Sequence, residues 1–298
     1  MDSHDAGVVD AMRNAAAPRK GAVLGPKARP DFNAGLAANA PFSPDVQFWP
    51  DVVGGVPGLW CESSDADFGA QILFLHGGCY VLGSAEAARN FAAQFATRAH
   101  ANTFVADYRL APEHPFPAAM DDALAVYQGV AEGADRIALV GESAGGGLAL
   151  ALLAILAGRD DRPGAPRGVA VMSPWTDLAL TGASLTTRAD ADPIFTKPVL
   201  AHFADLYLQG ADPKDPRASP LYGPAPEVAP PIRIDVGDDE VLLDDSLRYA
   251  EKLRDANLHA AVHVWSGMPH VFPSAIGRLK AANLAADEIG AFLRDCLR

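Results

Sequence analysis

Ser143 lies in the segment Gly-Glu-Ser-Ala-Gly at residues 141–145. A serine framed as Gly-X-Ser-X-Gly is typical of a nucleophile elbow, a tight strand-to-helix turn that exposes the hydroxyl. An apolar run at 136–140 precedes the segment and an apolar helical pattern at 147–156 follows it, so Ser143 is predicted to lie on such a turn. A serine hydroxyl is a weak nucleophile at its own pKa, so the chemistry also needs a base. The alternative interpretation is a tight packing turn around a buried serine.

A second glycine-rich turn follows the apolar residues 73–75 and reads His76-Gly77-Gly78. Glycine amides at the end of a strand can point at the oxyanion that forms when a serine attacks a carbonyl. We expect the oxyanion donors to be the backbone amides of Gly77, Gly78 and Ala144, because Ala144 directly follows the nucleophile. His76 is expected to brace this loop through hydrogen bonds.

A candidate base and a candidate acid occur later in the chain. His270 follows the strand-like residues 261–265, and an acidic stretch at 235–245 lies between Ser143 and His270. The order serine, acid, histidine is that of α/β-hydrolases and differs from the orders in chymotrypsin and subtilisin. Together these groups predict that His270 takes the Ser143 proton while a carboxylate orients the imidazole.

Three further segments make a resemblance to a known family specific. They are residues 108–119 (YRLAPEHPFPAA), 172–178 (MSPWTDL) and 267–272 (GMPHVF). With the two glycine-rich blocks, the chain resembles the hormone-sensitive-lipase-like carboxylesterases, a bacterial branch of the α/β-hydrolases. The resemblance implies an α/β-hydrolase fold with a mostly parallel central sheet, helices on both faces and a helical cap. It also implies a serine esterase for short-to-medium acyl esters that needs no cofactor and no metal.

Three positions depart from the family pattern. Cys79 stands where the family usually has a third glycine, and Glu142 replaces the aspartate before the nucleophile. The position that matches the family's catalytic aspartate is Glu240. A glutamate can hold the histidine tautomer as an aspartate does, provided that its backbone lies one methylene farther back. Asp239 and Asp244 remain alternatives for the triad acid.

Strands and helices alternate from residue 46 onward. Strands are expected at about 47–53, 57–62, 70–76, 102–107, 136–140, 168–173, 231–236 and 260–265, and helices at about 86–100, 118–131, 145–157, 245–256 and 281–296. This predicts one α/β catalytic domain at 46–298, with the catalytic loops at the carboxyl ends of the strands. By resemblance, residues 1–45 and an insertion at about 178–225 form the cap. Five aromatic residues can either line an acyl pocket or pack the cap onto the core: Trp49, Trp60, Phe195, Phe203 and Tyr207.

Composition narrows the classes of partner. The formal net charge is −13 and no basic stripe is present, which argues against nucleic acid and favours a neutral ester as substrate. The three cysteines have no metal-ligand spacing and fit a reducing compartment. No secretory signal or membrane span is recognisable, so a cytoplasmic location is expected. By family resemblance, the strand near 261–265 can pair across a homodimer.

Two other functions are alternatives on this fold. Amides, lactones and carbamates pass through a similar tetrahedral oxyanion, so the triad alone does not separate them from esters. A non-catalytic small-molecule receptor on this fold is expected to lack the triad histidine, whereas His270 is present.

Overall fold

A computed structural model describes residues 1–158, 164–226 and 228–298. Its centre is an eight-stranded sheet with the order β1-β2-β4-β3-β5-β6-β7-β8. The strands are β1 (Val46–Val53), β2 (Val56–Ser63), β3 (Asp67–Leu75), β4 (Ala101–Ala106), β5 (Arg136–Glu142), β6 (Gly168–Met172), β7 (Ile232–Gly237) and β8 (Ala260–Trp265). β1 pairs antiparallel with β2, and β2 with β4, while all other neighbours in the sheet are parallel. The predicted mostly parallel sheet is therefore confirmed.

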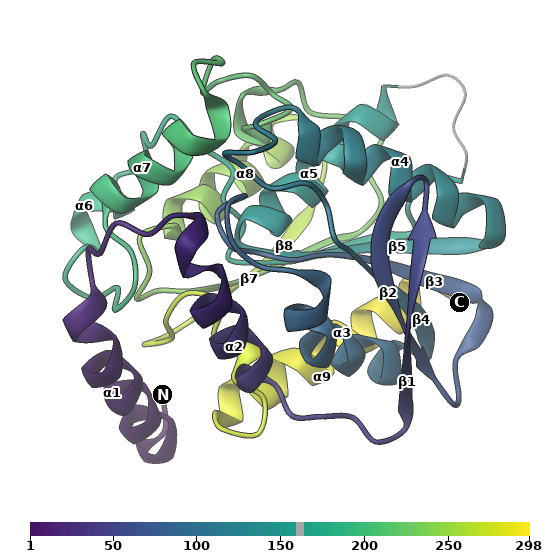
Figure 1. The fold of residues 1–298 in the computed structure, drawn as a ribbon, viewed down its shortest axis with the longest axis horizontal. Coiled ribbons are helices and arrows are strands. Elements are labelled where there is room, and N and C mark those ends of the chain that lie inside the picture. Colours follow the sequence, from purple (N-terminus) through teal and green to yellow (C-terminus); the bar gives the residue numbers. More distant parts are fainter. Residues whose placement is uncertain (159–163, 227) are drawn as a thin grey trace.

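The central strands are apolar because both of their faces are covered, as is usual for parallel sheets. Helices α3 (Ala85–Ala99) and α9 (Lys280–Cys296) cover one face, and α4 (Ala118–Gly133), α5 (Ala144–Ala157) and α8 (Leu243–Asp255) cover the other (Figure 1). A separate cluster of buried apolar side chains lies on each side of the sheet. Strand β5 and helix α5, which flank Ser143, are therefore both held by core packing.

Every strand and helix expected from residue 46 onward is present, with bounds that differ by a few residues. The largest difference among the strands is at β3, which begins at Asp67 rather than at about residue 70. Its first residues are exposed or half-buried, and Phe68 is 80% exposed. They therefore lack the continuous apolar pattern by which a buried strand is recognised.

The N-terminal segment and the insertion lie against each other. Residues 1–45 contain α1 (Ser3–Ala16) and α2 (Arg29–Asn39), and the insertion contains α6 (Ser184–Thr187) and α7 (Lys197–Leu208). Lys20 Nζ donates to the carbonyl of Ala189 at 2.7 Å, and His202 Nε2 lies 3.0 Å from the carbonyl oxygen of Leu24. The purple and green segments of Figure 1 are therefore in contact. The division of the chain into a cap and a catalytic domain stays a prediction.

The cysteines Cys61, Cys79 and Cys296 are free thiols. Burial raises the pKa of the Cys61 and Cys79 thiols, which favours their neutral forms. Within the described ranges, no helix has the length and apolar character needed to cross a membrane.

Candidate active site

Ser143 lies on the sharp turn between β5 and α5. Its φ of 55° is in the left-handed region, which a non-glycine residue keeps only when the surrounding structure holds it there. Two glycines allow the close approach: a Cβ on Gly145 would lie 2.0 Å from the carbonyl oxygen of Leu75, and one on Gly141 would lie 2.3 Å from that of Gly145. Helix α5 can therefore begin directly against the neighbouring strand.

Four residues of the site, three of them predicted from the sequence, follow four adjacent strands of the sheet. Ser143 comes after β5, Ser173 after β6, Glu240 after β7 and His270 after β8. Because these strands run parallel, their carboxyl ends meet at one edge of the sheet. Ligand and catalytic sites of open α/β sheets usually lie at this edge.

The structure brings Ser143, His270 and Glu240 into one hydrogen-bonded chain. His270 Nε2 lies 2.9 Å from Ser143 Oγ, and His270 Nδ1 lies 2.5 Å from Glu240 Oε2. All three side chains are buried. Burial lowers the pKa of His270, but Glu240, with smaller contributions from Asp192 and Glu142, raises it by more, so this pKa is above its usual value. The arrangement can move a proton from the serine to the histidine while the carboxylate stabilises the imidazolium.

The second oxygen of the Glu240 carboxylate is held by groups that the sequence interpretation did not assign. Oε1 accepts hydrogen bonds from the amide of Gly237 at 2.9 Å and from Ser173 Oγ at 2.7 Å. Ser173 Oγ in turn accepts from the amide of Val271 at 3.0 Å. Ser173 is buried with a φ of 48°, another left-handed residue held by its surroundings. It therefore ties the acid to the residue that follows the histidine.

The two alternative acids face other partners. The Asp239 carboxylate forms an ion pair with Arg13 of α1. Asp244 Oδ2 accepts a hydrogen bond from the amide of Ser184 at 2.9 Å. Neither carboxylate is within hydrogen-bond distance of His270, whose Nδ1 faces Glu240.

The oxyanion loop differs from expectation at Gly77. Its amide donates to Glu142 Oε1 at 2.6 Å, so it is not available to an oxyanion in this structure. The amides of Gly78, Cys79 and Ala144 have no acceptor among the described residues. Burial raises the pKa of Glu142, while the Gly77 amide and His270 favour its charged form. The longer acid before the nucleophile thus anchors the loop at Gly77 and leaves the amides of Gly78, Cys79 and Ala144 free to donate.

His76 braces this loop. Its Nδ1 lies 2.7 Å from the carbonyl oxygen of Gly77, and its ring stacks on Tyr108 with 4.4 Å between centroids. The Tyr108 hydroxyl donates to the carbonyl of His76 at 2.6 Å. Burial lowers the pKa of His76, which favours a neutral ring. These contacts suit a residue that holds the backbone rather than one that reacts.

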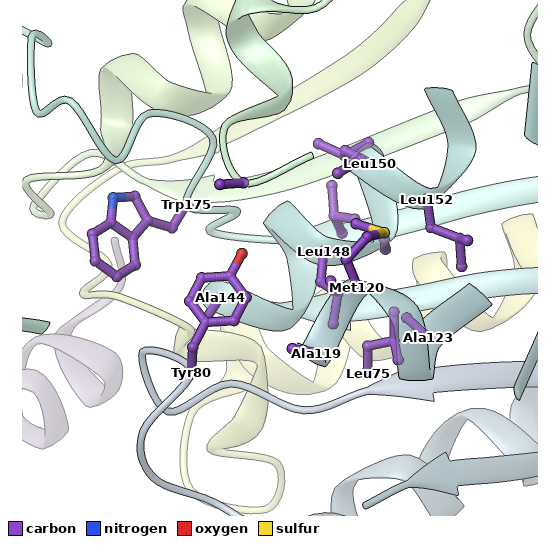
Figure 2. Close-up of a cluster of buried hydrophobic side chains, with 14 of the residues drawn as sticks. Leu75, Tyr80, Ala119, Met120, Ala123, Ala144, Leu148, Leu150, Leu152 and Trp175 are labelled. Carbon is purple, nitrogen blue, oxygen red and sulfur yellow. The ribbon is translucent and has the colours of Figure 1, made fainter. Parts of the chain in front are cut away.

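Two aromatic residues of the insertion reach the site. The Phe195 ring packs at 89° to the His270 ring with 4.9 Å between centroids. Tyr207 stacks on Tyr80 of the oxyanion loop at 3.9 Å and 6°. Tyr80 also packs against Trp175 with 6.2 Å between ring centroids, and Figure 2 draws both side chains together with buried hydrophobic residues of α5 such as Leu148.

The other three aromatic candidates lie elsewhere. Trp49 and Trp60 face each other across β1 and β2, which β4 and β3 separate from β5. Trp60 packs on Phe104 at 5.0 Å. Phe203 is buried within α7. The structure therefore brings Phe195 and Tyr207, but not Trp49 or Trp60, to the catalytic edge.

Over the part of the chain that the structure describes, no group of three or more His, Cys, Asp or Glu side chains could hold a metal ion. The chemistry offered by the described site is that of a serine, a histidine and a carboxylate.

Comparison with known proteins agrees with this geometry. The sequence pattern of the α/β hydrolase fold family matches residues 72–274. An acetyl-hydrolase of Streptomyces hygroscopicus is 38% identical, with 81% of each chain covered. An esterase of Acinetobacter venetianus is 34% identical, with 85% of this chain and 83% of that protein covered. The crystal structure of an esterase from the bacterial hormone-sensitive lipase family superimposes with a TM-score of 0.91 at 36% identity, covering 100% of this chain and 99% of the other.

The chain therefore belongs to the α/β-hydrolase fold family, within its bacterial hormone-sensitive-lipase branch. The resemblance predicted from its motifs is confirmed.

Proposed function

We propose that this chain is a serine carboxylesterase that hydrolyses short-to-medium acyl esters through an acyl-enzyme intermediate. Its family makes it a carboxylic ester hydrolase. The observation that carries the mechanism is the chain of hydrogen bonds from Ser143 Oγ through His270 to Glu240. Ser143 is the nucleophile, His270 the general base and Glu240 the triad acid.

In this mechanism His270 Nε2 takes the Ser143 proton as the hydroxyl oxygen attacks the ester carbonyl. Glu240 keeps the proton on Nδ1 and stabilises the imidazolium. The imidazolium then protonates the leaving alcohol, and the acyl group stays on Ser143. Water repeats the cycle with His270 as base, and the carboxylic acid departs.

The oxyanion is bound by the amides of Gly78, Cys79 and Ala144 in this proposal. Ala144 directly follows the nucleophile, Gly78 and Cys79 lie on the loop after β3, and none of the three amides has an acceptor among the described residues. One such donor is worth about 3 kcal/mol of transition-state stabilisation. The amide of Gly77 contributes indirectly, because its bond to Glu142 orients the loop.

The charge around His270 favours neutral esters. Glu240, Asp192 and Glu142 all stabilise a positive charge on this histidine. Their fields and the net charge of −13 oppose the approach of an anionic substrate. The acetyl-hydrolase among the relatives supports the short end of the acyl range.

Hydrolysis of an amide, lactone or carbamate is the second candidate, because it uses the same tetrahedral oxyanion. A series of p-nitrophenyl esters from acetyl to decanoyl, measured beside matched anilides, separates the two. We expect turnover to be highest for short acyl groups and the anilides to react far more slowly. Turnover of the anilides at rates near those of the esters would overturn the ester assignment.

The nucleophile is tested by Ser143→Ala together with labelling by a phosphonate. The variant should lose ester turnover while its circular dichroism spectrum is unchanged. In the parent protein, the label should be found on Ser143 alone. Residual turnover near that of the parent, or labelling at another serine, would contradict the assignment.

We also propose a cytoplasmic location and a homodimer, each on a single observation. All three cysteines are free thiols, and β8 forms an end of the sheet with mostly half-buried residues. Cell fractionation and sedimentation at several protein concentrations test the two proposals.

A further inference from the structure

Asp192 is a buried carboxylate in the insertion, on the segment between α6 and α7. Its Oδ1 accepts hydrogen bonds from the amides of Ile194 at 2.7 Å and Phe195 at 2.8 Å. Its Oδ2 accepts from the amide of Val241 at 2.9 Å. Burial raises the pKa of Asp192, and these three amides oppose that effect by favouring the charged form. A buried charge is costly unless its hydrogen bonds are made, so Asp192 needs both of these backbone segments in place.

The two oxygens of the Asp192 carboxylate bind two different backbone segments, one beside the acid Glu240 and one beside the base His270. Val241 directly follows Glu240, so Oδ2 holds the backbone of the acid loop. Oδ1 closes the turn that presents Phe195, whose ring packs edge to face against His270 at 4.9 Å. The Asp192 side chain therefore contacts both the loop that carries Glu240 and the turn that carries Phe195, which packs on His270.

The Phe195 contact adds a constraint that the hydrogen bonds do not supply. The bonds to Ser143 and Glu240 hold the two ring nitrogens of His270, which still allows the imidazole to tilt about the line between them. A ring packed at 89° on the imidazole opposes that tilt. Phe195 is only half-buried, so it also separates part of the base from solvent.

We propose that Asp192 and Phe195 are positioning residues through which the insertion sets the geometry of the Glu240–His270 pair. The proposal rests on the catalytic roles given above to Ser143, Glu240 and His270. Neither residue reacts with the substrate in this proposal. They act through the histidine and the acid loop, so their loss should lower turnover rather than substrate binding.

The ring contact is tested by replacing Phe195 with tyrosine, leucine and alanine. Tyrosine keeps the ring, leucine keeps most of the apolar volume, and alanine keeps neither. We expect kcat on p-nitrophenyl acetate to follow the order Phe and Tyr, then Leu, then Ala, with a loss of about tenfold for alanine. KM should stay within about twofold throughout, because the contact is to the base and not to the substrate.

The matched control is Ile194→Ala, which removes a large apolar side chain from the adjacent, 41% exposed position. It should leave kcat and KM unchanged. Rates are expressed per active site, counted by phosphonate titration, so that a loss of folded protein does not imitate a loss of turnover.

The carboxylate is tested by Asp192→Asn. The asparagine oxygen can still accept from Ile194 and Phe195, but its NH2 group then faces the Val241 amide, where two donors meet. This variant therefore breaks the link to the acid loop and removes a charge that stabilises the His270 imidazolium, while it keeps the Phe195 turn. We expect a fall in kcat of about tenfold or more, because a buried charged hydrogen bond is lost. Asp190→Asn, the same change at an exposed position two residues earlier, should have no effect.

Several outcomes would overturn the proposal. If Phe195→Ala changes KM and the acyl-chain preference but not kcat, Phe195 is a pocket wall and not a positioning residue. If kcat per active site is unchanged in Phe195→Ala and Asp192→Asn, the insertion does not set the geometry of the pair. Should Asp192→Asn fail to fold, the Phe195 series decides by itself. Failure of the catalytic assignment is distinguishable, because Ser143→Ala would then retain turnover.

Discussion

The turn that carries Ser143 and the loops that carry Glu240 and His270 are built in different ways. The residues of the turn lie in one continuous stretch, where Gly141 and Gly145 allow backbone contacts, to Gly145 and to Leu75, that are too close for any Cβ atom. The Glu240–His270 pair is assembled from segments that lie far apart in the chain. His270 is 127 positions from Ser143 in sequence, and the hydroxyl of Ser173 reaches Glu240 across 67 positions.

This difference determines which substitutions each part tolerates. The elbow depends on backbone space, so its sequence pattern is strict and visible as a motif. The acid–base pair depends on hydrogen bonds between side chains and on neighbouring strand ends, which leaves only scattered residues in the sequence. Variants that alter one hydrogen bond without altering shape are therefore the sharpest tests of the assembled half.

Glu240→Gln should give the largest effect in that half. Oε1 accepts from both Gly237 and Ser173, so the glutamine oxygen is expected to stay there and its NH2 group to face His270 Nδ1. Nδ1 must then be the acceptor, which puts the ring proton on Nε2, where it cannot take the serine proton. A loss on the order of 10⁴ in kcat has precedent for this change of tautomer in another serine hydrolase.

Asp239→Asn and Asp244→Asn are the controls, because they make the same kind of change on neighbouring carboxylates that face Arg13 and Ser184. Each should cost much less turnover than Glu240→Gln. If Asp239→Asn loses most of the turnover and Glu240→Gln keeps nearly all of it, the triad acid is Asp239 and not Glu240.

The pH dependence of kcat/KM gives a smaller and graded effect. His270 must be neutral to act as a base, and burial lowers its pKa while Glu240, with Asp192 and Glu142, raises it by more. Activity should therefore fall as the pH drops through a pKa above the usual histidine value of about 6.5. Glu240→Gln removes the main charge that raises this pKa, so the acid limb of its residual activity should move to lower pH. If activity falls at the same pH in the parent and in Glu240→Gln, the Glu240 carboxylate does not act on the titrating group.

The sequence predicted the elbow, the sheet and the positions of most elements because each depends on local pattern. The Gly-X-Ser-X-Gly spacing and the two apolar runs beside it place Ser143 between β5 and α5. The buried strands read as short apolar runs, and the helices between them as periodic ones. Glycine and strand signals of this kind need no knowledge of the distant parts of the chain.

The hydrogen bond from Gly77 to Glu142 and the contact of Ser173 with Glu240 were not predicted, for a different reason. The bond from the Gly77 amide to Glu142 depends on the reach of a side chain 65 positions away, and no local pattern reports it. Ser173 could have been found from topology: β6 pairs with β7, so the residue after β6 must lie beside the loop that carries the acid. No sequence pattern indicated the contact of Phe195 with His270, because the insertion interrupts the alternation of strands and helices.

Ser173→Ala should lower kcat much less than Glu240→Gln does, and it separates hydrogen bonding from backbone strain. It removes one donor to Glu240 and leaves the buried Val271 amide without its acceptor. A hydrogen bond to a charged group is worth about 1.5–3 kcal/mol, so we expect kcat to fall by about tenfold and the melting temperature to decrease. Ser246→Ala is the matched control, because Ser246 is equally buried and its hydroxyl has no partner among the described residues. Ser173→Gly relieves the left-handed φ of 48° but also lacks the hydroxyl. If the glycine variant is as slow as the alanine variant, the hydroxyl matters; if it is as fast as the parent, Ser173 acts only through the backbone.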